Sequence, residues 1–108
     1  MPTPVLVIVC FKPKPGQEND LLAVLSDHQP VLRSLGLVTD RAAVVMRAKD
    51  GTMIEVFEWK SQAAIEAAHS NPEVHKLWKR FEAVCDYVPI NSLAEAAHMF
   101  PGFEPVEV

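Results

Sequence analysis

The segment 57–74 constrains the fold more than any other, because its residues favour a strand, a helix, a break and a second helix in turn. Ser61 is a preferred N-cap residue directly after the apolar strand, and alanine-rich helix formers follow it. Asn71 and Pro72 end that helix and begin the next one, since proline suits the first position of a helix but not its interior. Apolar residues then recur at helical spacing as far as Cys85. The segment therefore predicts one strand followed by two consecutive helices.

A strand and a long helix are expected before this segment. The run 5–11 is apolar and rich in β-branched residues, and it stops at two prolines and a glycine that cannot continue a strand. Leucines then recur at helical spacing from residue 17 until Gly36, a residue type that commonly ends helices. Pro30 falls inside this pattern, so the helix is expected to kink or split near Gln29.

A hairpin and a last strand complete the expected sheet. Residues 37–48 and 52–59 flank an Asp-Gly pair, which favours a tight turn between antiparallel strands. Residues 86–90 predict a short strand at an edge of the sheet, because Pro89 cannot donate a backbone hydrogen bond. The predicted class is α+β, a ferredoxin-like βαββαβ unit with a four-stranded antiparallel sheet and helices on one face.

A single domain is expected over residues 1–108, with its core at 5–91 and a C-terminal tail at 92–108. Ser92 and Glu95 match a capping box, which predicts a short helix at the start of the tail. Aromatic residues between prolines follow, and they predict an extended segment anchored on the surface.

Composition and charge exclude several kinds of partner. The chain has 10 basic and 14 acidic residues, a net charge of −4, and no extended basic cluster, so nucleic-acid binding is not expected. The run 5–11 is too short to span a bilayer or to form a signal peptide, so a cytoplasmic protein without membrane contact is expected. Cys10 and Cys85 stand in apolar settings without the spacing of zinc ligands, which favours two buried thiols.

The first strand predicts a partner for the sheet. Both the odd-numbered and the even-numbered residues of the run 5–11 are apolar, whereas a sheet covered on one side should alternate apolar with polar residues. A chain of 108 residues is expected to have no second layer of its own for the other face. A second copy of the same sheet is then the expected cover, and a homodimer is predicted.

The chain from residue 5 to about residue 90 resembles the dimeric α+β barrel superfamily, and in particular the antibiotic biosynthesis monooxygenase (ABM) domain. The likeness rests on Phe57-Glu58-Trp59-Lys60-Ser61, on Ala67-Ala68-His69-Ser70-Asn71-Pro72 and on Lys14-Pro15-Gly16-Gln17-Glu18. The resemblance implies two sheets packed as a dimeric α+β barrel. It implies one of several activities, since the family includes cofactor-free monooxygenases, haem-degrading enzymes and isomerases.

Haem-degrading members of this family use an asparagine in the first strand, a tryptophan after the third strand and a histidine that binds iron. This chain has no asparagine in the run 5–11, and Ala68 stands near the tryptophan position. Trp78 or Lys79 stands near the histidine position. The resemblance therefore implies no cofactor, and a small apolar or aromatic metabolite held in a pocket between the helices and the sheet.

Within such a pocket the resemblance makes His69 the candidate base, because histidine is the most common general base. Trp59 and Trp78 are candidates for stacking on the substrate. His28, in the apolar stripe of the first helix, and Arg47, on a strand, are further candidates for substrate binding. Each has a structural alternative: His69 caps backbone carbonyls, and the two tryptophans belong to the core.

The direction of three strand charges is left open, because Arg41, Arg47 and Glu55 either line an interior or face solvent. Metal binding is not expected, since no two histidines stand four residues apart on a helix. Two functions remain open. One is a small cofactor-independent monooxygenase or isomerase with His69 near the substrate, and the other is a non-catalytic dimeric module that binds a small apolar ligand or only stabilises an assembly.

Overall fold

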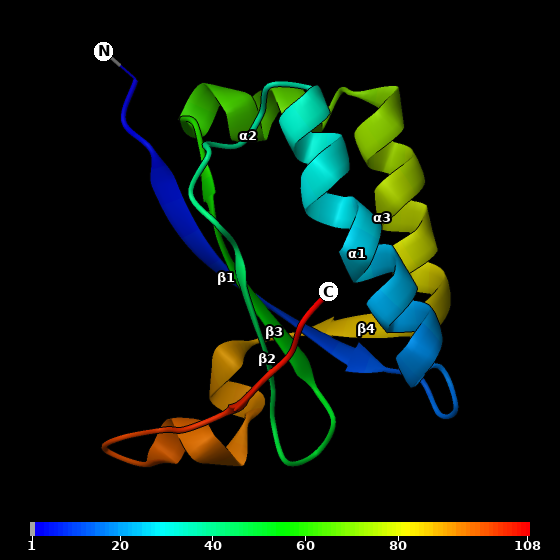
Figure 1. Cartoon of the computed structure of the whole chain (residues 1–108), viewed down its shortest axis with the longest axis vertical. Helices are drawn as coiled ribbons and strands as arrows, with labels where there is room; N and C mark the ends of the chain where they lie inside the picture. Colours follow the sequence, from blue (N-terminus) through cyan, green and yellow to red (C-terminus); the bar gives the residue numbers. More distant parts are fainter. Residues whose placement is uncertain (1) are drawn as a thin grey trace.

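Within residues 2–108, which a computed structural model describes, the chain forms one antiparallel sheet and three α-helices (Figure 1). The sheet has five strands in the order β4-β1-β3-β2-β5. The α+β class and the antiparallel sheet are confirmed, and the prediction of four strands is wrong because the tail adds a fifth. The elements are β1 (Val5–Pro13), α1 (Glu18–Ser34), β2 (Val44–Arg47), β3 (Met53–Trp59), α2 (Gln62–Ala68), α3 (Pro72–Val84), β4 (Cys85–Val88), the 3₁₀ turns η1 (Ile90–Ser92) and η2 (Ala94–Ala97), and β5 (Glu104–Pro105).

The two short-range helix signals are confirmed. The Ser61 hydroxyl accepts a hydrogen bond from the backbone N–H of Ala64 at 3.0 Å and starts α2. The Asn71 side chain accepts from the N–H groups of Glu73, at 2.9 Å, and Val74, at 3.4 Å, and Pro72 takes the first position of α3. These caps let α3 begin at once after α2.

The expected split of the helix at Pro30 is wrong, since α1 is continuous from Glu18 to Ser34 with Pro30 inside it. Pro30 lies on the exposed side of the helix, as does Ser26, whose carbonyl would have bonded the N–H that proline lacks. Water can therefore satisfy that carbonyl.

The hairpin is confirmed, but its first strand is shorter than the predicted 37–48. Gly51 has a φ of 92°, the conformation that the turn requires. β2 covers only Val44–Arg47, and Val38 forms an isolated bridge with Trp59. Between them the Thr39 hydroxyl accepts from the N–H of Arg41, a local bond that competes with strand pairing.

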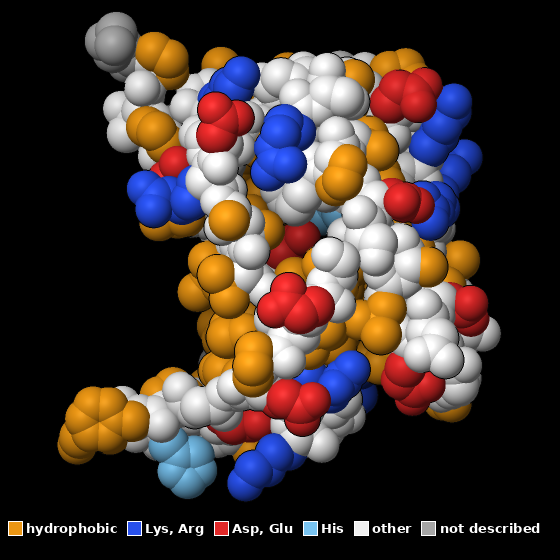
Figure 2. Space-filling view, viewed as in Figure 1, with side chains coloured by type: hydrophobic (Ala, Val, Ile, Leu, Met, Phe, Trp, Pro, Cys, Tyr) orange, Lys and Arg blue, Asp and Glu red, His pale blue; other side chains and the backbone are white. Residues whose placement is uncertain are grey.

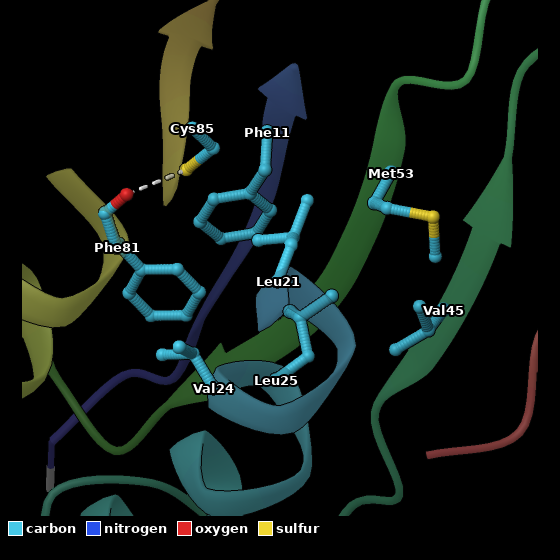
Figure 3. Close-up of a cluster of buried hydrophobic side chains, with 8 residues drawn as sticks. All are labelled: Phe11, Leu21, Val24, Leu25, Val45, Met53, Phe81 and Cys85. Carbon is cyan, nitrogen blue, oxygen red and sulfur yellow. Dashed lines mark hydrogen bonds between the residues drawn. The ribbon is translucent and has the colours of Figure 1, made fainter. Parts of the chain in front are cut away.

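Helices α1 and α3 pack side by side over one face of the sheet and bury the larger core (Figure 1). One cluster joins Leu21, Val24 and Leu25 of α1 to Phe11 of β1 and Phe81 of α3, and Figure 3 shows these side chains pointing toward one another. The rings of Phe11 and Phe81 are stacked with centroids 4.5 Å apart. These contacts fix the distance between the helix layer and the sheet.

The opposite face of the sheet is covered over one half by the chain's own tail. Leu93 is buried there against Cys10, Ile54 and Ala48, and Phe103 is packed on the same cluster. The expectation that the chain has no cover of its own is therefore wrong for this half. The reason is the length of the tail, which returns along the sheet and pairs with β2 as β5.

The capping-box helix is wrong as predicted, because the segment forms two 3₁₀ turns in place of an α-helix. The Ser92 hydroxyl donates to the Pro89 carbonyl and caps no helix. Glu95 is buried, and its Oε2 accepts from the backbone N–H of Lys49 at 2.9 Å. The Glu95 side chain therefore bonds the hairpin turn and is not used in a capping box.

Candidate functional site

A cavity of about 320 Å³ lies between the sheet and helices α1 and α3. This volume is at the small end of ligand sites, which run from roughly 300 to 1,000 Å³. Its wall is mostly aromatic and aliphatic, with one histidine and one glutamate. The lining residues are Val7, Val9 and Phe11 of β1, His28 of α1, Phe57 and Trp59 of β3, Trp78, Phe81 and Glu82 of α3, and Tyr87 of β4.

His28, the histidine of the cavity wall, belongs to a buried hydrogen-bonded group centred on Glu55, which does not itself line the cavity. The Nδ1 atom of His28 lies 2.7 Å from Oε1 of Glu55, and the side-chain amide of Gln29 donates to Oε2 at 3.3 Å. Glu55 is 0% exposed and His28 is 4% exposed. A carboxylate accepts hydrogen bonds, so we assign the ring proton to Nδ1. Nε2 is then the nitrogen of His28 that is left to meet a molecule in the cavity.

The sheet register places Glu55 under α1. Glu55 pairs with Val9 on one side and with Val45 on the other, and it shares its face of β3 with Phe57 and Trp59. His28 lies on the buried stripe of α1, which faces this part of the sheet. The edge of its ring meets Phe57, with centroids 5.4 Å apart. The ring of His28 is therefore held from two sides.

Of the five residues predicted for the site, three line the cavity: His28, Trp59 and Trp78. Arg47 does not line it. It lies on β2, and its guanidinium donates to Glu104 of β5 at 2.9 Å. The open question about Glu55 is answered too, since this charge points inward and is buried.

His69, the predicted base, lies outside the lining of the cavity. It is exposed at the end of α2, and its Nδ1 donates to the Ile65 carbonyl at 2.8 Å. His75 donates from Nε2 to the His69 carbonyl at 2.6 Å. The ring edge of His69 meets Trp78 with centroids 5.2 Å apart, so Trp78 stands between this histidine and the cavity.

Sequence reasoning missed the partner of His28 and the outer wall of the cavity. Glu55 is two residues from Met53 and two from Phe57, so the period of a strand puts all three on one face. A charged residue between two apolar residues of that face was the available signal. Glu82 and Tyr87 gave no local signal. Their place in the wall depends on how α3 and β4 pack.

Burial shifts the acid–base behaviour of two groups beside the cavity. It raises the pKa of the buried Cys85 thiol to about 11, and partial burial together with nearby negative charges raises the pKa of the half-exposed Tyr87 hydroxyl to about 12. The Cys85 thiol donates to the Phe81 carbonyl at 3.1 Å. Both groups therefore keep their protons at neutral pH.

Within residues 2–108, no group of three or more histidine, cysteine, aspartate or glutamate side chains is arranged to hold a metal ion. None of the helices in that range combines the length and the apolar character needed to cross a membrane.

Comparison with known proteins identifies the fold and no more. No family model and no curated protein sequence matches the chain. The solved structure of Rv0793 from Mycobacterium tuberculosis superposes with a TM-score of 0.65, over 80% of this chain and 89% of that chain, at 19% sequence identity. At this identity the likeness shows a shared compact fold.

Proposed function

We propose that the chain binds a small apolar or aromatic metabolite in the cavity and that His28 removes a proton from it, as in a cofactor-independent monooxygenase of the ABM type. The observation that carries this proposal is that His28, a residue of the aromatic cavity wall, is hydrogen-bonded to the buried carboxylate of Glu55 behind it. Glu55 orients the ring through Nδ1, so Nε2 can accept a proton from a bound molecule. Trp59, Phe57 and Phe81 offer surfaces on which a planar substrate stacks.

The chemistry needs molecular oxygen and no other reagent. Nε2 of His28 takes a proton from an activated carbon of the substrate, and the resulting carbanion is electron-rich. One electron passes from the carbanion to oxygen, and the two radicals that result combine to form a carbon–oxygen bond. The peroxide anion then takes the proton back from His28 and becomes a hydroperoxide. Loss of water from a CH–O–OH group leaves a ketone, so one oxygen atom enters the product and the other leaves as water.

The test is protein-dependent consumption of oxygen with a panel of quinols and anthrones, with the spontaneous rate subtracted. His28→Ala should lower the rate at least a hundredfold, as expected for loss of a general base. His69→Ala is the matched control, because His69 is exposed and outside the cavity lining. A fall in rate with His69→Ala and not with His28→Ala would return the role of base to His69 and overturn this assignment.

The second candidate is a non-catalytic binding module. It is favoured by Gln29, whose side-chain amide donates the second hydrogen bond to Glu55. Both carboxylate oxygens of Glu55 then have partners within the protein, so the buried group can serve the fold without a ligand. This candidate predicts heat of binding for the same panel in calorimetry, without oxygen uptake above the spontaneous rate.

We also propose that the ferredoxin-like unit pairs through its sheet, as in a dimeric α+β barrel. Beyond the half covered by the tail, Ile8, Val56 and Val44 form one row across three strands. Ile8 is 57% exposed, Val44 is 53% exposed and the neighbouring Leu6 is 57% exposed. Figure 2 shows hydrophobic side chains along the left side of the molecule, above the protruding C-terminal segment. A second copy of this apolar surface is the occupant that matches it.

A further inference from the structure

A carboxylate stands at the outer wall of the cavity. Glu82 of α3 lines the cavity, and it also lines a neighbouring groove of about 250 Å³. Within residues 2–108 its side chain forms no ion pair, because the bond from the Lys14 amine goes to the backbone carbonyl of Glu82. The negative charge of Glu82 is therefore available to a ligand.

Aromatic rings accompany this carboxylate. Trp78 lines both the cavity and the groove, and Tyr87 lines the cavity. Aromatic faces attract ammonium and guanidinium groups, and a nearby carboxylate adds to that attraction. The combination of Glu82, Trp78 and Tyr87 has the chemistry of a site for a cation.

Three basic residues lie near Glu82, and their position decides which charge a ligand meets. Lys14 bonds the backbone carbonyl of Glu82, His75 and Lys79 line the groove, and none of the three is in the lining of the cavity. A charged group on a ring inside the cavity therefore meets Glu82 in the cavity wall, and these three basic side chains lie outside that wall. The end of the cavity is therefore negative, whereas the outer groove has charges of both signs.

From these observations the geometry points to an outer subsite, formed by Glu82 with Trp78 and Tyr87, that selects ligands with an ammonium group attached to an aromatic body. The inference rests on the proposed ligand cavity and adds the charge of the ligand to it. Glu82 is a specificity-determining residue in this scheme, with no part in proton removal.

The test compares three molecules that share one ring system: 2-naphthylmethylamine, 2-naphthylacetate and the neutral 2-ethylnaphthalene. Their dissociation constants are measured by calorimetry at neutral pH and low salt. The amine should bind about tenfold more tightly than the carboxylate, as expected for a partly solvated charge pair with a cation–π contact. Glu82→Gln should reduce this ratio to about twofold, since it removes the charge and keeps the shape.

Glu66→Gln is the matched control, because it removes the same charge from an exposed position on α2 that lines neither the cavity nor the groove. It should leave the tenfold ratio unchanged. Binding of the neutral naphthalene without preference for the amine, or a preference that survives Glu82→Gln, overturns the subsite while the cavity proposal stands. Failure of all three molecules to bind overturns the cavity proposal and the subsite together.

Discussion

Nδ1 of His28 and Oε1 of Glu55 lie 2.7 Å apart, although 27 residues of chain separate them. His28 lies on the buried side of α1, and Glu55 lies on the face of β3 that is turned toward α1. Both side chains are buried, so neither can exchange this contact for water. The pair therefore matters to the stability of the fold as well as to the proposed chemistry.

The first prediction concerns this pair. Glu55→Ala should lower the free energy of unfolding by about 3 kcal/mol, because it leaves the side chains of His28 and Gln29 buried without their partner. Glu55→Gln should cost less, since an amide oxygen can still accept from His28. Urea denaturation measures both values. A loss below about 0.5 kcal/mol for Glu55→Ala would show that the buried group contributes nothing to stability.

The second prediction concerns the tail that covers half of the outer sheet face. Leu93 is 3% exposed, so Leu93→Ala should cost about 3 kcal/mol through loss of buried surface and the cavity that remains. Phe100 belongs to the same tail but is 88% exposed, so Phe100→Ala should change stability by less than about 0.5 kcal/mol. Thermal and urea unfolding compare the two variants. Equal effects would mean that the tail does not pack on the sheet.

The third prediction is a loss of stability in alkali. Burial raises the pKa of Cys85 from 9.0 to about 11 and that of Tyr87 from 10.0 to about 12. As pH rises above 9.0, the unfolded chain releases these protons first, so stability falls until the folded groups ionise as well. In the native protein, the urea concentration at the midpoint of unfolding should therefore fall as the pH is raised above 9.0.

Substitution separates the sources of that decline. The double variant Cys85→Ala, Tyr87→Phe should show a flatter dependence on pH, because it removes both groups. Cys10 leaves a remaining slope, since burial raises its pKa too. An unchanged slope in the double variant would show that neither group is responsible.

The fourth prediction tests the proposed dimer. Ile8→Lys places a charge in the exposed apolar row, where a single chain tolerates it because Ile8 is 57% exposed. Light scattering should give the mass of two chains for the native protein and of one chain for this variant. Ala83→Lys adds the same charge at an exposed position on α3 and should remain dimeric. A native protein with the mass of one chain would refute the dimer.

Some features of this protein were readable from short segments. Ser61, Asn71, Pro72 and Gly51 act on backbone groups within a few residues, so their positions predict the start of α2, the start of α3 and the hairpin turn. The periodicity of α1 also placed His28 on its inner side. These signals are local, and they determined the order of the elements and the α+β class.

The tertiary structure decided which histidine faces the cavity and what holds it. His69 lies within the segment 67–72 that carries the family resemblance, but its ring donates locally to the Ile65 carbonyl, whereas His28 meets a carboxylate from another element. The 3₁₀ turns of the tail and the fifth strand were decided in the same way. Each depends on contacts between residues far apart in the chain, and such contacts leave no mark on the local pattern of either segment.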